Sequence, residues 1–137
     1  LRMDKIKIPI TIAQEIIDHL SSNLPEEACG ILAGKDGKVS INRSITNSLH
    51  SPVRYFMEPM ELYQALKFID EEQLDLLAIY HSHPNGPDRP SETDIKEFLY
   101  PGVATIIGLK DNTGWKLKGF IINMATYDEI DLEMIES

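Results

Sequence analysis

Two histidines separated by one residue follow an apolar segment of the chain. His81 and His83 close the stretch 74–83, and Pro84 comes next. Side chains at positions i and i+2 of a strand point to the same face, so a strand ending here would present both imidazoles together. Two imidazoles at this spacing can bind one Zn²⁺. A pair of half-buried structural histidines is the alternative, but the position at a strand end, before a loop with Gly86 and Pro87, favours a metal site.

Asp94 is the candidate third ligand. The ten residues 84–93 separate it from His83, which is enough chain for a loop that folds back. Ser91 and Asp94 also form the pattern of a helix capping box, so a purely structural role competes with ligation. The two roles are compatible, because a capped helix start holds its side chains rigidly. Two histidines and one aspartate would leave a fourth zinc position open, as catalytic zinc sites do.

A hydrolytic zinc site also needs a group that moves protons, and two neighbouring glutamates are candidates. Glu26 and Glu27 follow Pro25 and stand at the start of an expected strand over 27–33. On such a strand Glu27, Cys29 and Ile31 would share one face. Both glutamates could equally be a solvated strand entrance, and the residue pattern alone does not choose between these interpretations.

The elements that must position these residues follow from the periodicity of apolar side chains. We expect strands over 6–10, 27–33, 39–46, 74–82, 103–109 and 115–123, with a possible last strand in the tail. We expect helices over 11–22, from Pro59 to about residue 72, and from about Ser91 to just before Pro101. The fold class is therefore α+β or α/β, a mixed sheet flanked by helices, and the whole chain 1–137 is expected to be one domain.

Composition narrows the class of protein. The net charge is −9, with 22 acidic and 13 basic residues, so nucleic-acid binding is not expected. We expect no membrane span and no signal peptide, and hence a cytoplasmic protein. Cys29 is the single cysteine, which excludes an intrachain disulfide and favours a buried core thiol over a nucleophile. His19 and His50 are interpreted as surface residues without a role.

Taken together, three segments resemble the JAMM (MPN+) family of zinc metallopeptidases. They are PEEACGILAG at 25–34, HSHP at 81–84 and PSETD at 90–94, with the family's spacing between the last two. The order of the expected elements also fits, so the resemblance covers nearly the whole chain. The resemblance implies the MPN fold, which is similar to that of cytidine deaminases. Because long insertions are absent, the chain is most similar to small stand-alone prokaryotic members.

The resemblance assigns a role to each residue. It implies one zinc per chain, held by His81, His83 and Asp94. It makes Glu27, not Glu26, the general acid/base, and Ser91 the hydroxyl that stabilises the developing oxyanion. The implied reaction is cleavage of an amide bond after the C-terminal Gly-Gly of a ubiquitin-like or sulfur-carrier protein. The loop 47–54 with residues 55–57 is a candidate grip on that C-terminal tail, or else a plain surface connection.

Three other interpretations remain open at this point. The RadC family, linked to DNA repair, has a similar histidine and aspartate segment, but the strand at 27–34 and the acidic charge favour the peptidase. A non-haem iron oxygenase also uses two histidines and one carboxylate, although the expected helices 11–22 and 59–72 are atypical of its scaffold. A non-catalytic MPN scaffold is the third interpretation. The pattern carries no indication of oligomeric state.

Overall fold

The structure is a computed structural model and describes residues 4–137. Within these residues, three helices and seven strands form in the order β1, α1, β2, β3, α2, β4, α3, β5, β6, β7. The helices are α1 (Ile10–Ser22), α2 (Pro59–Glu71) and α3 (Glu92–Lys96). The strands are β1 (Lys5–Pro9), β2 (Cys29–Lys35), β3 (Lys38–Ile45), β4 (Asp75–Ser82), β5 (Ala104–Asp111), β6 (Gly114–Asn123) and β7 (Thr126–Ile135). The expected types and order of elements are confirmed, including the last strand in the tail.

Several element boundaries differ from the expectation, and the largest difference is that α3 ends at Lys96 instead of just before Pro101. Ile10 belongs to helix α1 and is exposed, because the apolar alternation of β1 ends at Pro9. Strand β2 begins at Cys29, so Glu27 precedes the strand rather than opening it. Glu27 is held instead by a loop, as described below.

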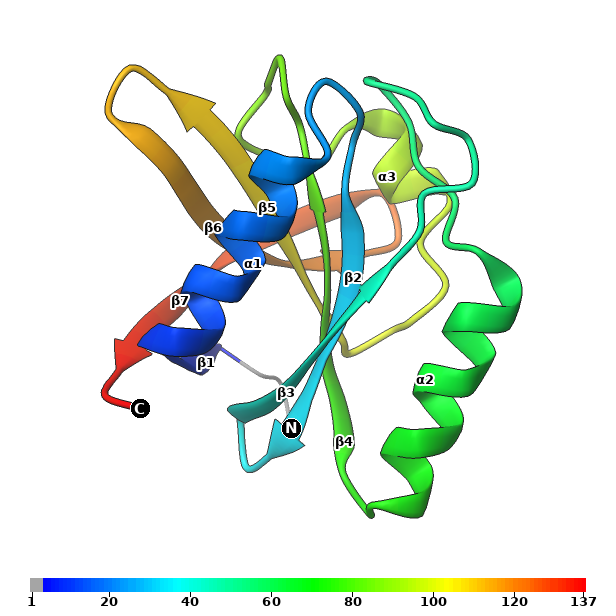
Figure 1. Cartoon of the computed structure of the whole chain (residues 1–137), viewed down its shortest axis with the longest axis vertical. Helices are drawn as coiled ribbons and strands as arrows, with labels where there is room; N and C mark the ends of the chain where they lie inside the picture. Colours follow the sequence, from blue (N-terminus) through cyan, green and yellow to red (C-terminus); the bar gives the residue numbers. More distant parts are fainter. Residues whose placement is uncertain (1–3) are drawn as a thin grey trace.

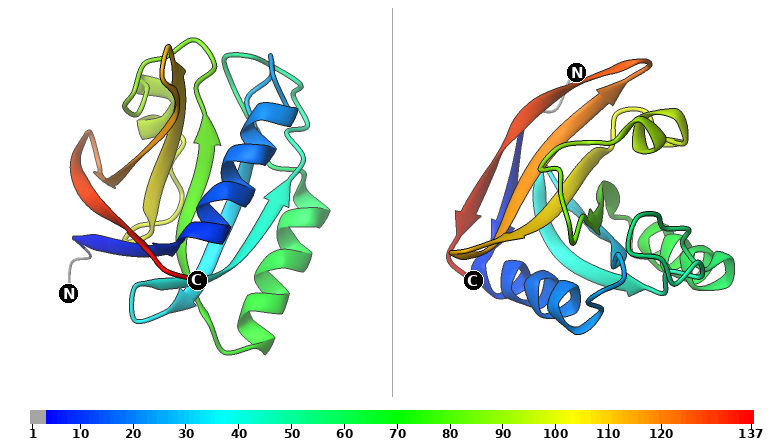
Figure 2. Two further views of the ribbon diagram at one scale, coloured as in Figure 1. Left: turned by 60° about the vertical axis from the view of Figure 1, so that its left-hand side comes forward. Right: turned by 90° about the horizontal axis from the view of Figure 1, so that it is seen from above.

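The sheet is mixed, as expected, but it closes into a barrel in the strand order β1-β3-β2-β4-β5-β6-β7. Strand β1 completes the barrel, because it pairs in parallel with β7 from Lys5 to Pro9 and with β3 at the single position Lys7↔Lys38. Figure 2 shows β1 and β7 side by side. Strand twist accumulates along the long hairpins β5-β6-β7 and curls the sheet until its ends meet. The prediction of a mixed sheet with helices is confirmed, but the closure of that sheet into a barrel was not predicted.

Strands β2 and β4 lie at the centre of the molecule with helices on both sides (Figure 1). Helix α1 buries Ile12, Ile16 and Leu20 in one apolar cluster, on a stripe of helical period. Helix α2 starts with Pro59 at its first turn and buries Ala65 and Ile69 in the second cluster. The carboxyl end of β4, which carries the histidine pair, is therefore set in a rigid core. Among residues 4–137, no helix has both the length and the apolar character needed to cross a membrane.

Candidate metal centre

His81 and His83 direct their side chains into the same space at the end of β4. His81 is the last but one residue of the strand and His83 follows it directly, so the alternation of an extended chain places both rings on one face. The two Nε2 atoms lie 3.1 Å apart. Both imidazoles are buried, with 1% of His81 and 4% of His83 exposed. The expected juxtaposition of the pair is confirmed in geometry.

Asp94 reaches the same point from helix α3. Its Oδ2 atom lies 3.1 Å from Nε2 of His81 and 3.1 Å from Nε2 of His83. The capping box is present as well, since Oγ of Ser91 accepts a hydrogen bond from the Asp94 N–H at 3.0 Å and Oδ2 of Asp94 accepts one from the Ser91 N–H at 2.8 Å. Capping and approach to the histidines are thus combined in one carboxylate, and Ser91 is joined to Asp94 by two bonds.

The triangle of three donor atoms matches the face of a zinc coordination tetrahedron. Ligand atoms about 2.0–2.1 Å from a tetrahedral zinc lie roughly 3.3–3.4 Å from one another. Nδ1 of His83 lies 2.7 Å from the carbonyl oxygen of Pro87, which fits an N–H donor at Nδ1 and leaves Nε2 as a lone-pair atom in the neutral ring. With an ionised Asp94, too few protons remain for three hydrogen bonds within the triangle. A cation at its centre would satisfy all three atoms.

The pKa shifts of His81 and Asp94 favour the protonation states that bind a metal ion, a neutral imidazole and an ionised carboxylate. Burial lowers the pKa of His81, which favours the neutral imidazole. Burial disfavours the ionised form of Asp94, but its contacts with the two histidines and with the N–H of Ser91 outweigh burial and hold its pKa below the ordinary value. For His83, burial is outweighed by hydrogen bonds to Asp94 and Pro87, which raise its pKa. Metal binding at this site would therefore compete with a proton on His83.

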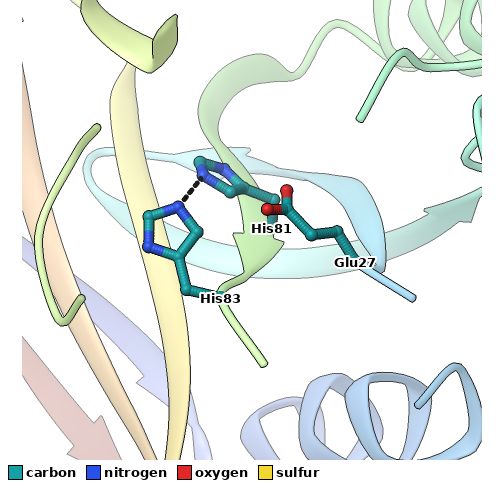
Figure 3. Close-up of side chains that lie close together, drawn as sticks. All are labelled: Glu27, His81 and His83. Carbon is teal, nitrogen blue, oxygen red and sulfur yellow. Dashed lines mark hydrogen bonds between the residues drawn. The ribbon is translucent and has the colours of Figure 1, made fainter. Parts of the chain in front are cut away.

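Glu27 stands beside the histidine pair, as Figure 3 shows. One carboxylate oxygen of Glu27 and one ring nitrogen from each histidine lie within 4.8 Å of one another. Glu27 is 4% exposed, and desolvation raises its pKa to about 8, against the opposing charge of His83. A carboxyl group with a pKa near neutrality is suited to take up and release a proton.

Ser82, between the two histidines, joins the Glu27 segment to β4. Its Oγ accepts a hydrogen bond from the N–H of Ala28 at 2.9 Å, and its own N–H donates to the Ala28 carbonyl at 3.0 Å. The residue after Glu27 is therefore bound to the residue between the two histidines. This role of Ser82 could not be predicted from the sequence, since a serine between two histidines carries no distinctive signal.

The structure separates the other sequence candidates from the centre. Nδ1 of His50 lies 3.1 Å from Oε1 of Glu26, so Glu26 belongs to a different contact from Glu27. Cys29 is a buried core thiol, as expected, and burial raises its pKa to about 12. The interpretation of His19 as a plain surface residue is wrong. It is half-buried, and its Nδ1 lies 2.7 Å from the hydroxyl of Tyr80, whose side chain reaches from β4 to the carboxyl end of α1.

A cavity of about 840 Å³ adjoins the centre and includes His81 and Asp94 in its lining. Its remaining lining is largely apolar and comes from the segment before α2, from α2, from α3 and the segment after it, and from the sheet. These residues are Leu49, Arg54, Tyr55, Phe56, Met57, Pro59, Leu62, Tyr63, Leu66, Ile79, Thr93, Glu97, Phe98, Leu99, Tyr100, Thr105 and Ile122. Arg54 and Glu97 form an ion pair that links two of these walls. The Tyr55 ring stacks on the His81 ring with centroids 4.5 Å apart. The volume is in the range of ligand pockets.

Comparisons with known proteins agree on one family. The family model described as prokaryotic homologs of the JAB domain matches residues 9–118. The chain is 42% identical over 91 residues to a probable TtuB-protein conjugate cleaving protease of Thermus thermophilus, covering 66% of this chain and 61% of that protein. It is 38% identical over 89 residues to a desampylase of Pyrococcus furiosus, with 65% and 63% covered. The match thus spans less than two thirds of the length of these two relatives.

A third relative aligns along almost the whole chain. The chain is 28% identical over 131 residues to the CysO-cysteine peptidase of Mycobacterium tuberculosis, with 91% of this chain and 88% of that protein covered. Among solved structures, a protein from Desulfitobacterium hafniense is 29% identical with a TM-score of 0.86, covering 96% and 94% of the two chains. A structure described as a JAMM metalloprotease-like zinc site is 22% identical with a TM-score of 0.61, covering 96% and 98%, and shows the shared fold.

Proposed function

Because the chain belongs to the family of prokaryotic homologs of the JAB domain, we propose that it is a zinc-dependent peptidase or isopeptidase. Its substrate is a ubiquitin-like or sulfur-carrier protein, and the bond cleaved is the amide after the C-terminal Gly-Gly. One observation carries the proposal: Nε2 of His81, Nε2 of His83 and Oδ2 of Asp94 lie 3.1 Å from one another beside the buried Glu27. The names of the relatives, a conjugate cleaving protease, a desampylase and a CysO-cysteine peptidase, support this class of substrate.

Zinc fits the donor set of this site, and His81, His83 and Asp94 would hold one ion per chain. Two imidazole nitrogens and one carboxylate oxygen are ordinary zinc ligands, and their mutual distances are near those of a tetrahedral face. When bound there, zinc supplies a Lewis acid that makes water a stronger acid and polarises a carbonyl group. Three protein ligands are the number that catalytic zinc sites use.

Glu27 is the proposed general acid/base. Its carboxylate takes a proton from the attacking water and passes it to the nitrogen of the leaving amine, which breaks the amide bond without leaving an unstable amide anion. In the metal-free protein, burial raises the pKa of Glu27 to about 8. Glu26 does not serve, because its carboxylate contacts His50 and is partly exposed.

Ser91 is the proposed stabiliser of the substrate carbonyl. Its Oγ accepts the hydrogen bond from the Asp94 N–H, which leaves the hydroxyl proton free to donate to an oxygen that gains negative charge. The capping box fixes this hydroxyl relative to Asp94. One rigid helix start thus supplies both a ligand and a hydrogen-bond donor.

The adjoining cavity is the proposed binding place of the substrate tail. It includes His81 and Asp94 in its lining, and residues 54–57 form one of its walls. An extended chain ending in two glycines can approach the centre without side-chain clashes. Apolar side chains that precede the two glycines of the substrate would pack against the apolar lining of the cavity.

Chelator-sensitive release of a modifier tests the proposal. The protein is incubated with conjugates from its own cell extract, with and without a chelator, and the products are identified by mass. We expect free modifier ending in Gly-Gly only when metal is present, and none with E27Q. E26Q is the matched control and is expected to retain activity. The proposal would be contradicted if neither the chelator nor the E27Q substitution reduced the release of modifier. It would also be contradicted if the metal-loaded protein released no modifier.

A further inference from the structure

The segment between β3 and α2 folds around one buried side chain, that of Asn47. Asn47 is 3% exposed, and all four hydrogen-bonding positions of its amide are occupied. Nδ2 donates to the carbonyl oxygens of Glu27 at 3.0 Å and Arg54 at 3.1 Å. Oδ1 accepts from the backbone N–H groups of Leu49 and Phe56, both at 3.1 Å. A buried amide that makes every bond it can has one defined orientation.

The first of these bonds holds the main chain of Glu27. On its other side the Glu27 N–H donates to the carbonyl of Ser51 at 2.8 Å. Both polar backbone groups of Glu27 are thus bound to the segment 47–51 and not to a neighbouring strand, since β2 begins only at Cys29. The direction of the Glu27 side chain therefore depends on the shape of this segment.

The remaining bonds set the cavity wall. The Arg54 carbonyl and the Phe56 N–H, both bound by Asn47, flank Tyr55. The Tyr55 ring stacks on His81, and residues 54–57 line the cavity. One side chain consequently contacts the backbone of the proposed proton carrier and the backbone of the wall that faces the proposed metal ligand.

We propose that Asn47 is a positioning residue, which fixes the Glu27 carboxylate relative to the histidine pair and couples its position to the conformation of the wall 54–57. The inference rests on the proposed function for its kinetic part. None of the four bonds of Asn47 reaches the histidines or Asp94, and the one that reaches the proposed machinery directly is the bond to the Glu27 carbonyl. If a bound substrate tail displaced residues 54–57, the Asn47 amide would transmit this displacement to the backbone of Glu27.

Two variants test this role. Asn47→Ala removes all four bonds, whereas Asn47→Asp retains both acceptor positions for Leu49 and Phe56 and loses both donors to the carbonyls. Ser48→Ala is the control: Oγ of Ser48 donates to the Phe56 carbonyl at 2.9 Å, so it anchors the same segment without touching Glu27. We expect kcat at saturating conjugate to fall about tenfold to a hundredfold in both Asn47 variants, the scale of a misplaced catalytic group. Zinc content should stay unchanged, and S48A should keep its kcat.

A second measurement is independent of turnover. In metal-free protein, the carboxyl ¹³C resonance of Glu27, identified by its loss in E27Q, should move in N47A and N47D and stay in place in S48A. If the wild type cleaves no conjugate, the proposed function fails while this resonance still tests the hold of Asn47 on Glu27. An unmoved resonance in a folded Asn47 variant would overturn the inference. A rise confined to KM would also overturn it, because Asn47 would then serve the wall alone.

Discussion

Nε2 of His83 and Oδ2 of Asp94 lie 3.1 Å apart, although residues 84–93 separate them in the chain. His83 is fixed by its place after β4 and by the Pro87 carbonyl, and Asp94 by its capping bonds with Ser91. Each of the two side chains is thus fixed by hydrogen bonds that do not involve the other and do not require a metal ion. Such preorganisation of donor atoms favours tight and specific metal binding.

Asp94→Ala should lose most of the metal, because it removes one of three ligands and leaves two histidines on one strand end. We expect one zinc per chain in the wild type and a small fraction of this in the variant, measured by mass spectrometry of dialysed protein. Glu92→Ala, an exposed change in the same helix turn, is the control and should keep its zinc. A D94A protein with full zinc would refute the ligand set, and iron in the wild type would favour an oxygenase-like site.

Glu27→Gln should keep both the fold and the zinc and lose turnover. The amide cannot carry the proton from water to the leaving amine, while none of the three ligand contacts is removed. Melting temperature, zinc content and conjugate cleavage are measured on one preparation. Cleavage at the wild-type rate would assign the proton transfer to another group, and loss of zinc would make Glu27 a ligand instead.

Ser91→Ala should lower the rate by roughly 10²–10³-fold, the usual effect of removing one oxyanion donor. It should also destabilise the fold by about 1 kcal/mol, because the N-cap of α3 is lost. Ser91→Thr keeps a hydroxyl for both tasks and should retain most of the activity and the stability. Destabilisation with normal turnover in S91A would limit Ser91 to capping.

The stability of the metal-free protein should depend on pH through Glu27. Burial raises its pKa from 4.5 to about 8, so the folded state binds this proton more tightly than the unfolded state does. The resulting stabilisation is complete below pH 4.5 and is lost as the pH rises from there through about 8. Glutamine does not titrate, so E27Q should gain in stability relative to wild type over this range. Denaturant unfolding at pH 5, 7 and 9 measures the difference, and a constant difference would contradict the prediction.

Conjugates that differ only at the scissile bond test the substrate. A modifier ending in Gly-Gly should be cleaved much faster than the same modifier ending in Ala-Ala or Val-Val, because side chains there would hinder the approach of the backbone to the centre. The rates are compared at equal concentration with the same amine partner. Equal rates would indicate a general peptidase without a requirement for glycine.

Features that depend on neighbouring residues could be predicted from the sequence. The two-residue spacing of His81 and His83 on a strand, the capping box of Ser91 and Asp94, and the apolar stripes of α1 and α2 are all short-range patterns. Each follows from the period of one element, 2 for a strand and 3.6 for a helix, and therefore needs no knowledge of the rest of the chain. The resemblance to the metallopeptidase family rested on the same local segments.

Other features were decided only by tertiary packing. The pairing of β1 with β7 joins Lys5 to Asp131 and closes the barrel, which no local period reveals. Glu26 and Glu27 are neighbours of the same type in the sequence, and only the fold buries Glu27 by the histidines and turns Glu26 to His50. The four bonds of Asn47 reach from residue 27 to residue 56. Contacts of this kind depend on how twisted strands and covering helices fit together, a property of the whole chain that the sequence of any one segment does not contain.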